Sequence, residues 1–239
     1  YRRGPAFTAI SQKDWNDRAM ETPVAVLAGT PVDTQMGASF VMQAGLTACP
    51  FPLAADPRSQ TAFQISSQEE KLQAVRDVLA QAQSQGCRRV FVYCNSLSSS
   101  VDFPTLACET GLRIVTPLDV YRHLAPSYRR LGLIAANAQG LAGIERTLLT
   151  ANPELDLLGA CLLPAVLSIE AGLPPRELVA QHHLGELAEW YRTCGMEALI
   201  LGCTHFPYFK DALTEQTSLP LIDPAQEMIR LLLAYRRSH

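Results

Sequence analysis

Residues 89–95 read RVFVYCN, and residues 198–204 read ALILGCT. Each segment contains an apolar run that ends in a cysteine followed by a small polar residue. A run that is apolar on both faces is typical of a buried strand in a parallel sheet. The segments 116–119 (TPLD) and 220–223 (PLID) follow the two cysteines at similar intervals, and a helical pattern follows each of them. The chain therefore contains a weak internal repeat, which predicts two similar α/β halves.

Short apolar runs and amphipathic stretches alternate along the rest of the chain. Apolar residues spaced three or four apart predict helices at residues 35–43, 68–83, from 120, from 141, 175–194 and 225–235. The predicted strands lie at residues 24–29, 89–93, 113–115, 131–135, 160–163, 198–201 and 220–222. Alternation of this kind predicts βαβ units, and therefore an α/β fold with parallel sheets.

We expect two pseudo-symmetric flavodoxin-like lobes with parallel sheets and a cleft between them. The first lobe is predicted to contain residues 22–118 and 222–239, and the second residues 119–221, with residues 1–21 forming an N-terminal arm. Ligands of open parallel sheets bind beyond the carboxyl ends of the strands. The two cysteines that end strands are accordingly expected to face the cleft.

Composition narrows the class of protein. The chain has 239 residues, of which 48% are hydrophobic and 18% are charged, so it is long enough for a core and too apolar for disorder. It has no apolar run of about 18 residues, which argues against a membrane span. The formal net charge of -3 argues against nucleic acid or an anionic membrane surface as a partner. The expected partner is a small molecule or another protein.

The seven cysteines are odd in number, and no CxxC pair occurs among them. A chain of this length does not need disulfides, so we expect free thiols and a cytoplasmic location. The apolar stretch of a secretory signal does not follow Arg2 and Arg3. Some of the cysteines are expected to pack as small buried hydrophobic residues, namely Cys49, Cys87, Cys108 and Cys194.

Cys94 and Cys203 differ from the other cysteines because each ends a predicted strand and precedes polar side chains. A helix that begins there would add backbone N–H groups, which lower the pKa of a thiol. Two thiols on opposite sides of a cleft suit racemisation at an α-carbon, in which one group removes a proton and the other returns one to the opposite face. Positioned donors on the substrate carboxylate would stabilise the carbanion. These residues indicate a two-base racemase.

Several motifs also carry a resemblance to a known family. Residues 92–96 (VYCNS), 201–207 (LGCTHFP) and 164–172 (PAVLSIEAG) resemble the aspartate/glutamate racemases. Residues 33–37 (DTQMG) are similar to the family's Asp-Ser-x-x-Gly. The chain looks closest to the glutamate racemase branch, because the aspartate branch has glutamate where His205 stands. The resemblance extends from about residue 22 to about residue 235.

The resemblance implies an isomerase that interconverts the L and D enantiomers of glutamate or aspartate without a cofactor or a metal. It also implies a small-molecule amino-acid substrate and a D-amino-acid product that is a peptidoglycan precursor. The oligomeric state stays open, with a homodimer as one alternative. The implied acid/base residues are Cys94, assisted by Asp33, and Cys203, assisted by His205 and Glu170. The implied substrate-binding residues are Thr34, Asn95, Ser96, Thr204 and Asn137.

Other interpretations of single residues stay open at this point. Asp33 also fits a turn or helix-capping residue, Glu170 a solvated loop carboxylate, and His205 a capping residue. The chain departs from the family in three loops that contact substrate there, at residues 34–38, 62–64 and 137–139.

Other functions stay open as well. A one-thiol decarboxylase, a hydantoin-type racemase and a non-catalytic two-lobed binding protein fit the same frame. The sequence lacks the GxGxxG, Walker A and GxSxG patterns, and no lysine stands in a cofactor-like loop after a strand. Zinc binding by Cys94, Cys203 and His205 would lack a companion CxxC or HxxxH pair. The two-base racemase predicts that the two sulfurs line one cleft on the order of 7 Å apart.

Overall fold

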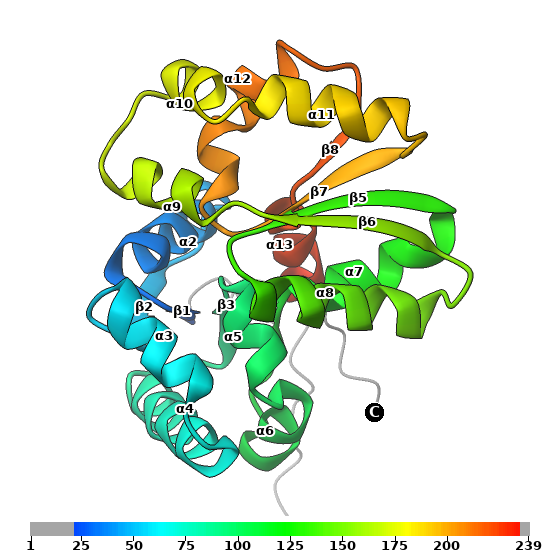
Figure 1. The fold of residues 1–239 in the computed structure, drawn as a ribbon. Coiled ribbons are helices and arrows are strands. Elements are labelled where there is room, and N and C mark those ends of the chain that lie inside the picture. Colours follow the sequence, from blue (N-terminus) through cyan, green and yellow to red (C-terminus); the bar gives the residue numbers. More distant parts are fainter. Residues whose placement is uncertain (1–21, 235–239) are drawn as a thin grey trace, which may run out of the picture.

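The computed structural model describes residues 22–234, so the predicted arm at residues 1–21, and residues 235–239, lie outside the described part. Two four-stranded sheets form the centres of two lobes (Figure 1). The first contains, in spatial order, β2 (Ala48–Pro52), β1 (Val24–Ala28), β3 (Arg89–Val92) and β4 (Arg113–Val115). The second contains β6 (Asp156–Cys161), β5 (Arg130–Ala135), β7 (Ala198–Gly202) and β8 (Leu221–Ile222). Neighbouring strands pair in parallel throughout both sheets.

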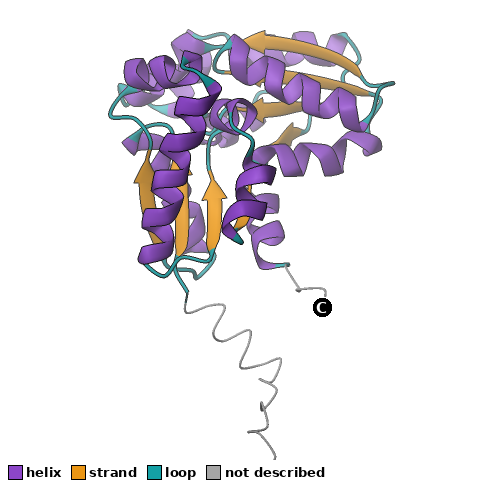
Figure 2. Ribbon diagram, turned by 90° about the horizontal axis from the view of Figure 1, so that it is seen from below, coloured by secondary structure: helices purple, strands orange, loops and turns teal. Residues whose placement is uncertain are grey.

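The two sheets have the same connectivity. In each sheet the first strand along the chain lies between the second and the third, and the fourth strand forms the far edge. Strand β3, which precedes Cys94, is therefore equivalent to β7, which precedes Cys203. This arrangement confirms the expected α/β fold with two pseudo-symmetric lobes. In Figure 2 the strands of the first sheet point toward the second lobe, so their carboxyl ends face it.

Helices connect the strands and cover the sheets. The helices up to β4 are α2 (Pro31–Gln43), α3 (Pro57–Ile65), α4 (Gln68–Ser84), α5 (Asn95–Ser100) and α6 (Phe103–Thr110). Those between β4 and β7 are α7 (Pro117–Leu124), η1 (Ala125–Ser127), α8 (Ala138–Ala151), α9 (Leu163–Glu170), α10 (Pro175–Gln181) and α11 (Leu184–Thr193). After β7 come η2 (Phe206–Phe209), α12 (Lys210–Thr214) and α13 (Ala225–Leu233).

The apolar strands give each sheet a buried core. Every residue of β1 and of β7 is buried, as their apolar runs predicted. The last helix, α13, returns to the core of the first sheet, where Ala225, Met228 and Leu232 pack. The lobe boundaries expected from the sequence extend into residues outside the described part, and they remain a prediction.

Helices α5 and α8 lie against each other across the two lobes. A Cβ atom on Gly143 of α8 would lie 1.9 Å from the Cβ of Ser99 on α5. A Cβ atom on Gly140, one turn earlier, would lie 3.7 Å from the Cβ of Ser96. The missing side chains let the helix that follows Cys94 pack directly on the second lobe.

One predicted helix is divided in the structure. Residues 175–194 form α10 and α11, because the chain turns at His183, whose φ is 51°. The turn lets Leu178 of α10 and Tyr191 of α11 both reach the core, where each is 0% exposed. A single straight helix presents one stripe to a core and does not allow both contacts. The prediction of one continuous helix is therefore wrong.

Strand β2 and helices α3 and α9 were not expected from the sequence. Strand β2 contains Pro50 and Pro52, which argue against a central strand. It lies at the edge of its sheet, where proline is tolerated because only one side pairs. The predicted strand at residues 160–163 is displaced, because β6 ends at Cys161 and α9 begins at Leu163.

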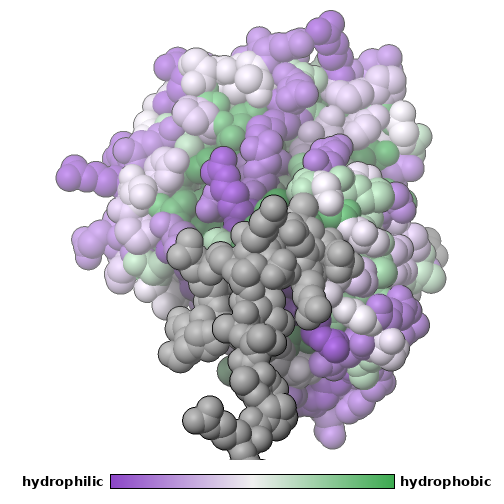
Figure 3. Space-filling view, turned by 180° about the vertical axis from the view of Figure 1, so that it is seen from behind, coloured by the Kyte–Doolittle hydropathy of each residue, from purple (hydrophilic) through white to green (hydrophobic). Residues whose placement is uncertain are grey.

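The surface is mixed in character. Hydrophilic and hydrophobic side chains alternate over the face shown in Figure 3. Within residues 22–234, no helix combines the length and the apolar composition that a membrane crossing requires.

The cysteines are free, and Cys108 and Cys194 are exposed, so the prediction that these two are buried is wrong. Cys87 is buried, as expected, and Cys49 is half-buried.

A substitution at Gly37 of α2 tests the packing between this helix and the first sheet. A Cβ atom there would lie 2.7 Å from the Cβ of Tyr93 and 2.9 Å from Cγ1 of Val26. We expect Gly37→Ala to lower the free energy of unfolding by about 1–3 kcal/mol, because overpacking outweighs the gain of about 1 kcal/mol that alanine brings to an open helix position. Urea unfolding followed by circular dichroism measures the change. Gln35→Ala, exposed on the same helix, is the control, and a Gly37→Ala protein of unchanged stability would contradict this packing.

Candidate active site

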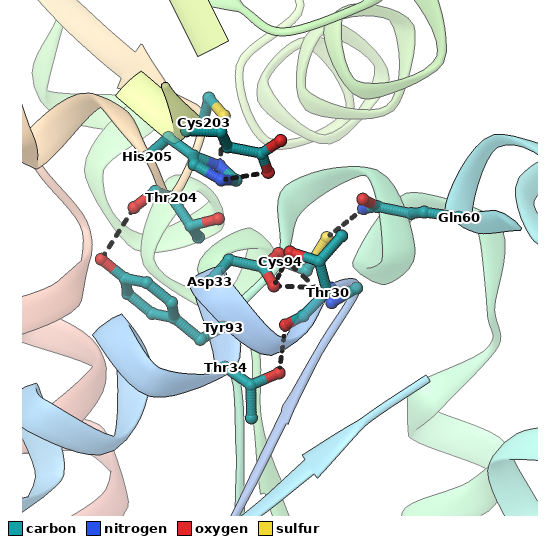
Figure 4. A network of polar contacts seen from close by, with 11 residues as sticks. Thr30, Asp33, Thr34, Gln60, Tyr93, Cys94, Cys203, Thr204 and His205 are labelled. Carbon is teal, nitrogen blue, oxygen red and sulfur yellow. Dashed lines mark hydrogen bonds and ion pairs between the residues drawn. The ribbon is translucent and has the colours of Figure 1, made fainter. Parts of the chain in front are cut away.

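One pocket between the lobes collects the side chains that the sequence singled out. It lies where the carboxyl ends of β3 and β7 meet, so it takes residues from both sheets. All but one of the predicted site residues line it, namely Asp33, Cys94, Asn95, Ser96, Asn137, Glu170, Cys203, Thr204 and His205. Figure 4 shows part of this site. The two strand-end thiols thus share one cavity, which the mirrored positions of the motifs predicted.

Cys94 lies between β3 and α5 with 3% of its surface exposed. Its Sγ lies 3.5 Å from the Ser96 hydroxyl and accepts a hydrogen bond from Nε2 of Gln60 at 3.6 Å. Burial, and after it the negative charge of Asp33, raise the pKa of the Cys94 thiol to about 11. The Ser96 hydroxyl and nearby backbone amides lower it in part. The thiol form of Cys94 therefore dominates at neutral pH.

Cys203 follows β7 and is 7% exposed. Its Sγ lies 3.7 Å from Nδ1 of His205. Burial is the main cause that raises the pKa of the Cys203 thiol, while the backbone N–H of His205 lowers it. On the other side of the imidazole, Nε2 lies 3.3 Å from Oε1 of Glu170, at the end of α9. The histidine thus stands between a thiol and a carboxylate, and Glu170 is not a solvated loop residue. His205 does occupy the N-cap position of η2, but its side chain makes no capping hydrogen bond there.

Asp33 has both of the roles that the sequence left open. It is the third residue of α2 and forms a capping box with Thr30. Its carboxylate accepts hydrogen bonds from the backbone N–H of Thr30 at 2.6 Å and of Gly29 at 3.2 Å. It also lines the pocket beside Cys94 (Figure 4). Burial raises the pKa of Asp33, against the effect of these hydrogen bonds and of His205.

Four of the five predicted substrate-binding residues line the pocket, and the fifth, Thr34, does not. Asn95 accepts a hydrogen bond from the Tyr121 hydroxyl at 2.9 Å through Oδ1. Its Nδ2 is buried and has no hydrogen-bond partner among the described residues. Asn137 caps α8 by accepting from the N–H of Gly140 at 2.9 Å. Thr34 is the exception, because its hydroxyl donates to the Thr30 carbonyl at 2.6 Å and it does not line the pocket.

Gln60 and Gln64, both on α3, line the pocket but were not predicted as site residues. Nε2 of Gln64 donates to the Ser96 hydroxyl at 2.7 Å, and Oε1 of Gln64 accepts from Nδ2 of Asn137 at 3.5 Å. Their four-residue spacing places them on one face of a helix. That spacing was the available signal, but α3 itself was not recognised.

The two cysteine motifs are joined directly. The Tyr93 hydroxyl donates to the carbonyl oxygen of Thr204 at 3.0 Å (Figure 4). Tyr93 directly precedes Cys94, and Thr204 directly follows Cys203. This bond therefore crosses from the first lobe to the second beside both thiols. Within the described range, no three His, Cys, Asp or Glu side chains converge to hold a metal ion.

The chain matches one protein-family model and is similar in sequence to several enzymes. The family model for Asp/Glu/hydantoin racemase matches residues 52–232. A glutamate racemase of Thermus thermophilus is 32% identical over 158 residues, which are 63% of this chain and 57% of that protein. The glutamate racemase of Limosilactobacillus reuteri is 30% identical over 152 residues, 56% of this chain and 57% of that protein. The matched part of the chain thus spans less than two thirds of these relatives.

Solved structures share the fold. The glutamate racemase of Francisella tularensis, in complex with D-glutamate, superposes with a TM-score of 0.69 at 16% identity, over 89% of this chain and 80% of that one. The allantoin racemase of Klebsiella pneumoniae superposes with a TM-score of 0.61 at 18% identity, over 89% of this chain and 86% of that one. At these identities the likeness concerns the two-lobed fold.

The charge of Asp33 can be tested through the reactivity of Cys94. We expect Asp33→Asn to lower the pKa of Cys94 from about 11, because it removes a negative charge that opposes the thiolate. The measurement is the rate at which iodoacetamide alkylates Cys94 between about pH 8 and about pH 10, followed by peptide mass spectrometry. Only the thiolate reacts, so each unit of lowered pKa raises the rate about tenfold at a fixed pH in this range.

Asp119→Asn is the matched control for this experiment. Asp119 has the same position in a capping box on α7, with Thr116 in place of Thr30, but it is not among the residues that line the pocket. Its substitution should leave the alkylation of Cys94 unchanged. An equal rate in Asp33→Asn and wild type would show that the charge of Asp33 does not govern this thiol.

Proposed function

The chain belongs to the Asp/Glu/hydantoin racemase family, and we propose that it interconverts the L and D enantiomers of glutamate or aspartate without a cofactor. One observation carries the proposal. Cys94 and Cys203 follow equivalent strands of two similar sheets and line the same pocket. The sequence relatives support an acidic amino acid as substrate, because they are glutamate racemases.

The reaction moves one proton off the α-carbon and one proton onto it. The Cys94 thiolate takes the α-proton from one face and becomes a thiol. The electron pair of the broken C–H bond moves into the carboxylate of the substrate. The Cys203 thiol then donates its proton to the opposite face and becomes a thiolate. The other enantiomer reacts by the same steps with the two cysteines exchanged.

Each thiol needs help to lose its proton, because burial raises the pKa of both. Asp33, beside Cys94, is the proposed partner on one side, where its carboxylate takes the thiol proton and thereby loses the negative charge that otherwise opposes the thiolate. On the other side Nδ1 of His205 lies 3.7 Å from the Cys203 sulfur, and Oε1 of Glu170 lies at ion-pair distance, 3.3 Å, from the far nitrogen of the ring. A base held at a thiol by a third group is the general arrangement for activating a nucleophile or a proton acceptor.

The pocket also offers donors for the substrate carboxylate. The free Nδ2 of Asn95 is the strongest candidate, because a buried donor without a partner is costly until a ligand accepts from it. Ser96, Thr204 and Asn137 line the same cavity. A homodimer, a cytoplasmic location and the use of the product as a peptidoglycan precursor belong to this proposal. The location rests on the free thiols, and the use of the product rests on the family resemblance.

Exchange of the α-proton tests the function. We expect the purified protein, with no cofactor added, to replace the α-proton of glutamate or aspartate with deuterium in D2O. The abstracted proton moves to a thiol, and thiol protons exchange with the solvent. Proton NMR of both enantiomers measures this loss. The Cys94→Ala/Cys203→Ala double variant is the control. Exchange with a hydantoin but with neither acid would indicate the hydantoin-type racemase, and no exchange with any of them would favour a binding protein.

Single-cysteine variants test whether the two thiols divide the faces of the substrate. We expect Cys94→Ala and Cys203→Ala each to lose racemisation in both directions, because a full turnover uses both groups. Each variant should still eliminate a leaving group from a substrate analogue of one handedness, since elimination needs a single base. The two variants should accept opposite enantiomers, as measured by chiral chromatography. Equal losses for both enantiomers in both variants would contradict this division.

A further inference from the structure

We propose that Gln60 is a further catalytic residue, whose side-chain amide donates a hydrogen bond to the Cys94 sulfur when Cys94 carries the negative charge. The inference rests on the function proposed above, because it assigns Cys94 the role of a base. It concerns one thiol only, so it predicts that proton abstraction from the two faces of the substrate responds differently.

The geometry of α3 brings the Gln60 amide to the sulfur. Nε2 of Gln60 lies 3.6 Å from Sγ of Cys94 and points toward it (Figure 4). One turn later, Nε2 of Gln64 donates to the Ser96 hydroxyl at 2.7 Å. The same face of α3 therefore contacts the start of α5 at two points, Cys94 at its N-cap and Ser96 in its first turn, and these contacts position Gln60.

A glycine makes room for this contact. A Cβ atom on Gly29 would lie 2.1 Å from Nε2 of Gln60 and 2.4 Å from its Cδ. The side chain of Gln60 thus lies directly over the backbone at the end of β1. The φ angle of Gly29 is not positive, so its backbone conformation would accept other residues. A larger side chain is excluded here by lack of space.

The charged groups near Cys94 explain why the hydrogen bond from Gln60 matters for the thiolate. Among the described residues that line the pocket there is no lysine or arginine. The ionisable side chain whose charge acts on Cys94 is an acid, Asp33, and this charge opposes the thiolate. Neutral donors must therefore stabilise the thiolate, and a hydrogen bond to a charged acceptor is about twice as strong as one between neutral groups. An amide also suits this task because it does not compete for the proton.

The second thiol has a different partner. Cys203 contacts the imidazole of His205, and Gln60 belongs to the first lobe, next to Cys94. A change at Gln60 should therefore affect proton abstraction from one face of the substrate. That face is identified experimentally as the one whose enantiomer loses exchange in Cys94→Ala.

Two substitutions of similar size separate hydrogen bonding from packing. Gln60→Met keeps the length of the side chain and removes the donor. Gln60→Glu keeps the shape and places a carboxylate against the sulfur. We expect alkylation of Cys94 by iodoacetamide at about pH 9 to fall about tenfold in Gln60→Met and further in Gln60→Glu, because each raises the pKa of the thiol. Alkylation of Cys203 should stay within about twofold of wild type.

Deuterium exchange should follow the same order. The enantiomer assigned to Cys94 should exchange about tenfold more slowly in Gln60→Met, and the opposite enantiomer should keep its rate. Gln73→Met is the matched control, because Gln73 is exposed on α4 and bonded to Asp77, outside the pocket. Gly29→Ala should displace the amide and reproduce the effect of Gln60→Met. Combined with Gln60→Met it should cause little further loss, since both remove one contact.

The outcomes distinguish this inference from the proposed function. Alkylation is measured without turnover, so it tests the hydrogen bond even if no substrate is found. An unchanged pH profile of Cys94 in both Gln60 variants would overturn the inference. Equal effects on Cys94 and Cys203, or on both enantiomers, would also overturn it, because they would indicate a general disturbance of the fold. Normal exchange in wild type with unaffected Gln60 variants would leave the racemase standing and the role of Gln60 refuted.

Discussion

The hydrogen bond from the Tyr93 hydroxyl to the Thr204 carbonyl oxygen joins the two loops on which the site depends. It connects the residue before one thiol with the residue after the other, so the separation of Cys94 and Cys203 depends on a buried contact. Both partners are almost fully buried, where a hydrogen bond is stronger and its loss leaves an unsatisfied group. The space for the tyrosine ring exists because Gly37 has no side chain. The packing of Tyr93 and its hydrogen bond therefore help to set the relative placement of the two lobes, next to the two cysteines.

Burial also sets the electrostatic character of the pocket. Two thiols and two carboxylates face it, and the described lining holds no lysine or arginine to balance them. Loss of water raises the pKa of both thiols and of Asp33. Burial therefore disfavours the thiolate form of both cysteines, and dipoles such as the amides of Gln60 and Asn95 surround the place where charge develops. Preorganised dipoles in a dry site stabilise a charge without having to reorient when it forms.

Much of the site was accessible from the sequence because the chemistry lies at strand ends. An apolar run that is buried on both faces identifies its own strand, and the residue after it lies at the carboxyl edge of the sheet. Cys94, Asn95, Cys203 and Thr204 were found in this way. Asp33 was found by resemblance, and its helix-capping role agrees with its position in the first turn of α2. The predicted substrate contact of Thr34 is not seen in the pocket, because its hydroxyl bonds to its own helix.

Helix α3 was not recognised, and with it the two glutamines of the pocket. Residues 57–65 form a short helix with a weakly apolar face, and its stability comes from contacts with the rest of the fold rather than from local propensity. The turn at His183 was missed for a similar reason. Apolar spacing continues through residues 175–194, and only the position of the core shows that the chain must turn to bury both Leu178 and Tyr191.

The sequence by itself determined the alternation of strands and helices, the internal repeat and the two cysteine motifs. These features depend on local periodicity and on the residue that follows a strand, and both are properties of neighbouring residues. Only the tertiary structure decided which side chains meet around each sulfur. Gln60 reaches Cys94 across 34 positions of the chain, and Tyr93 reaches Thr204 across 111. Such contacts depend on how two lobes pack, and no local pattern encodes the distance between residues that only folding brings together.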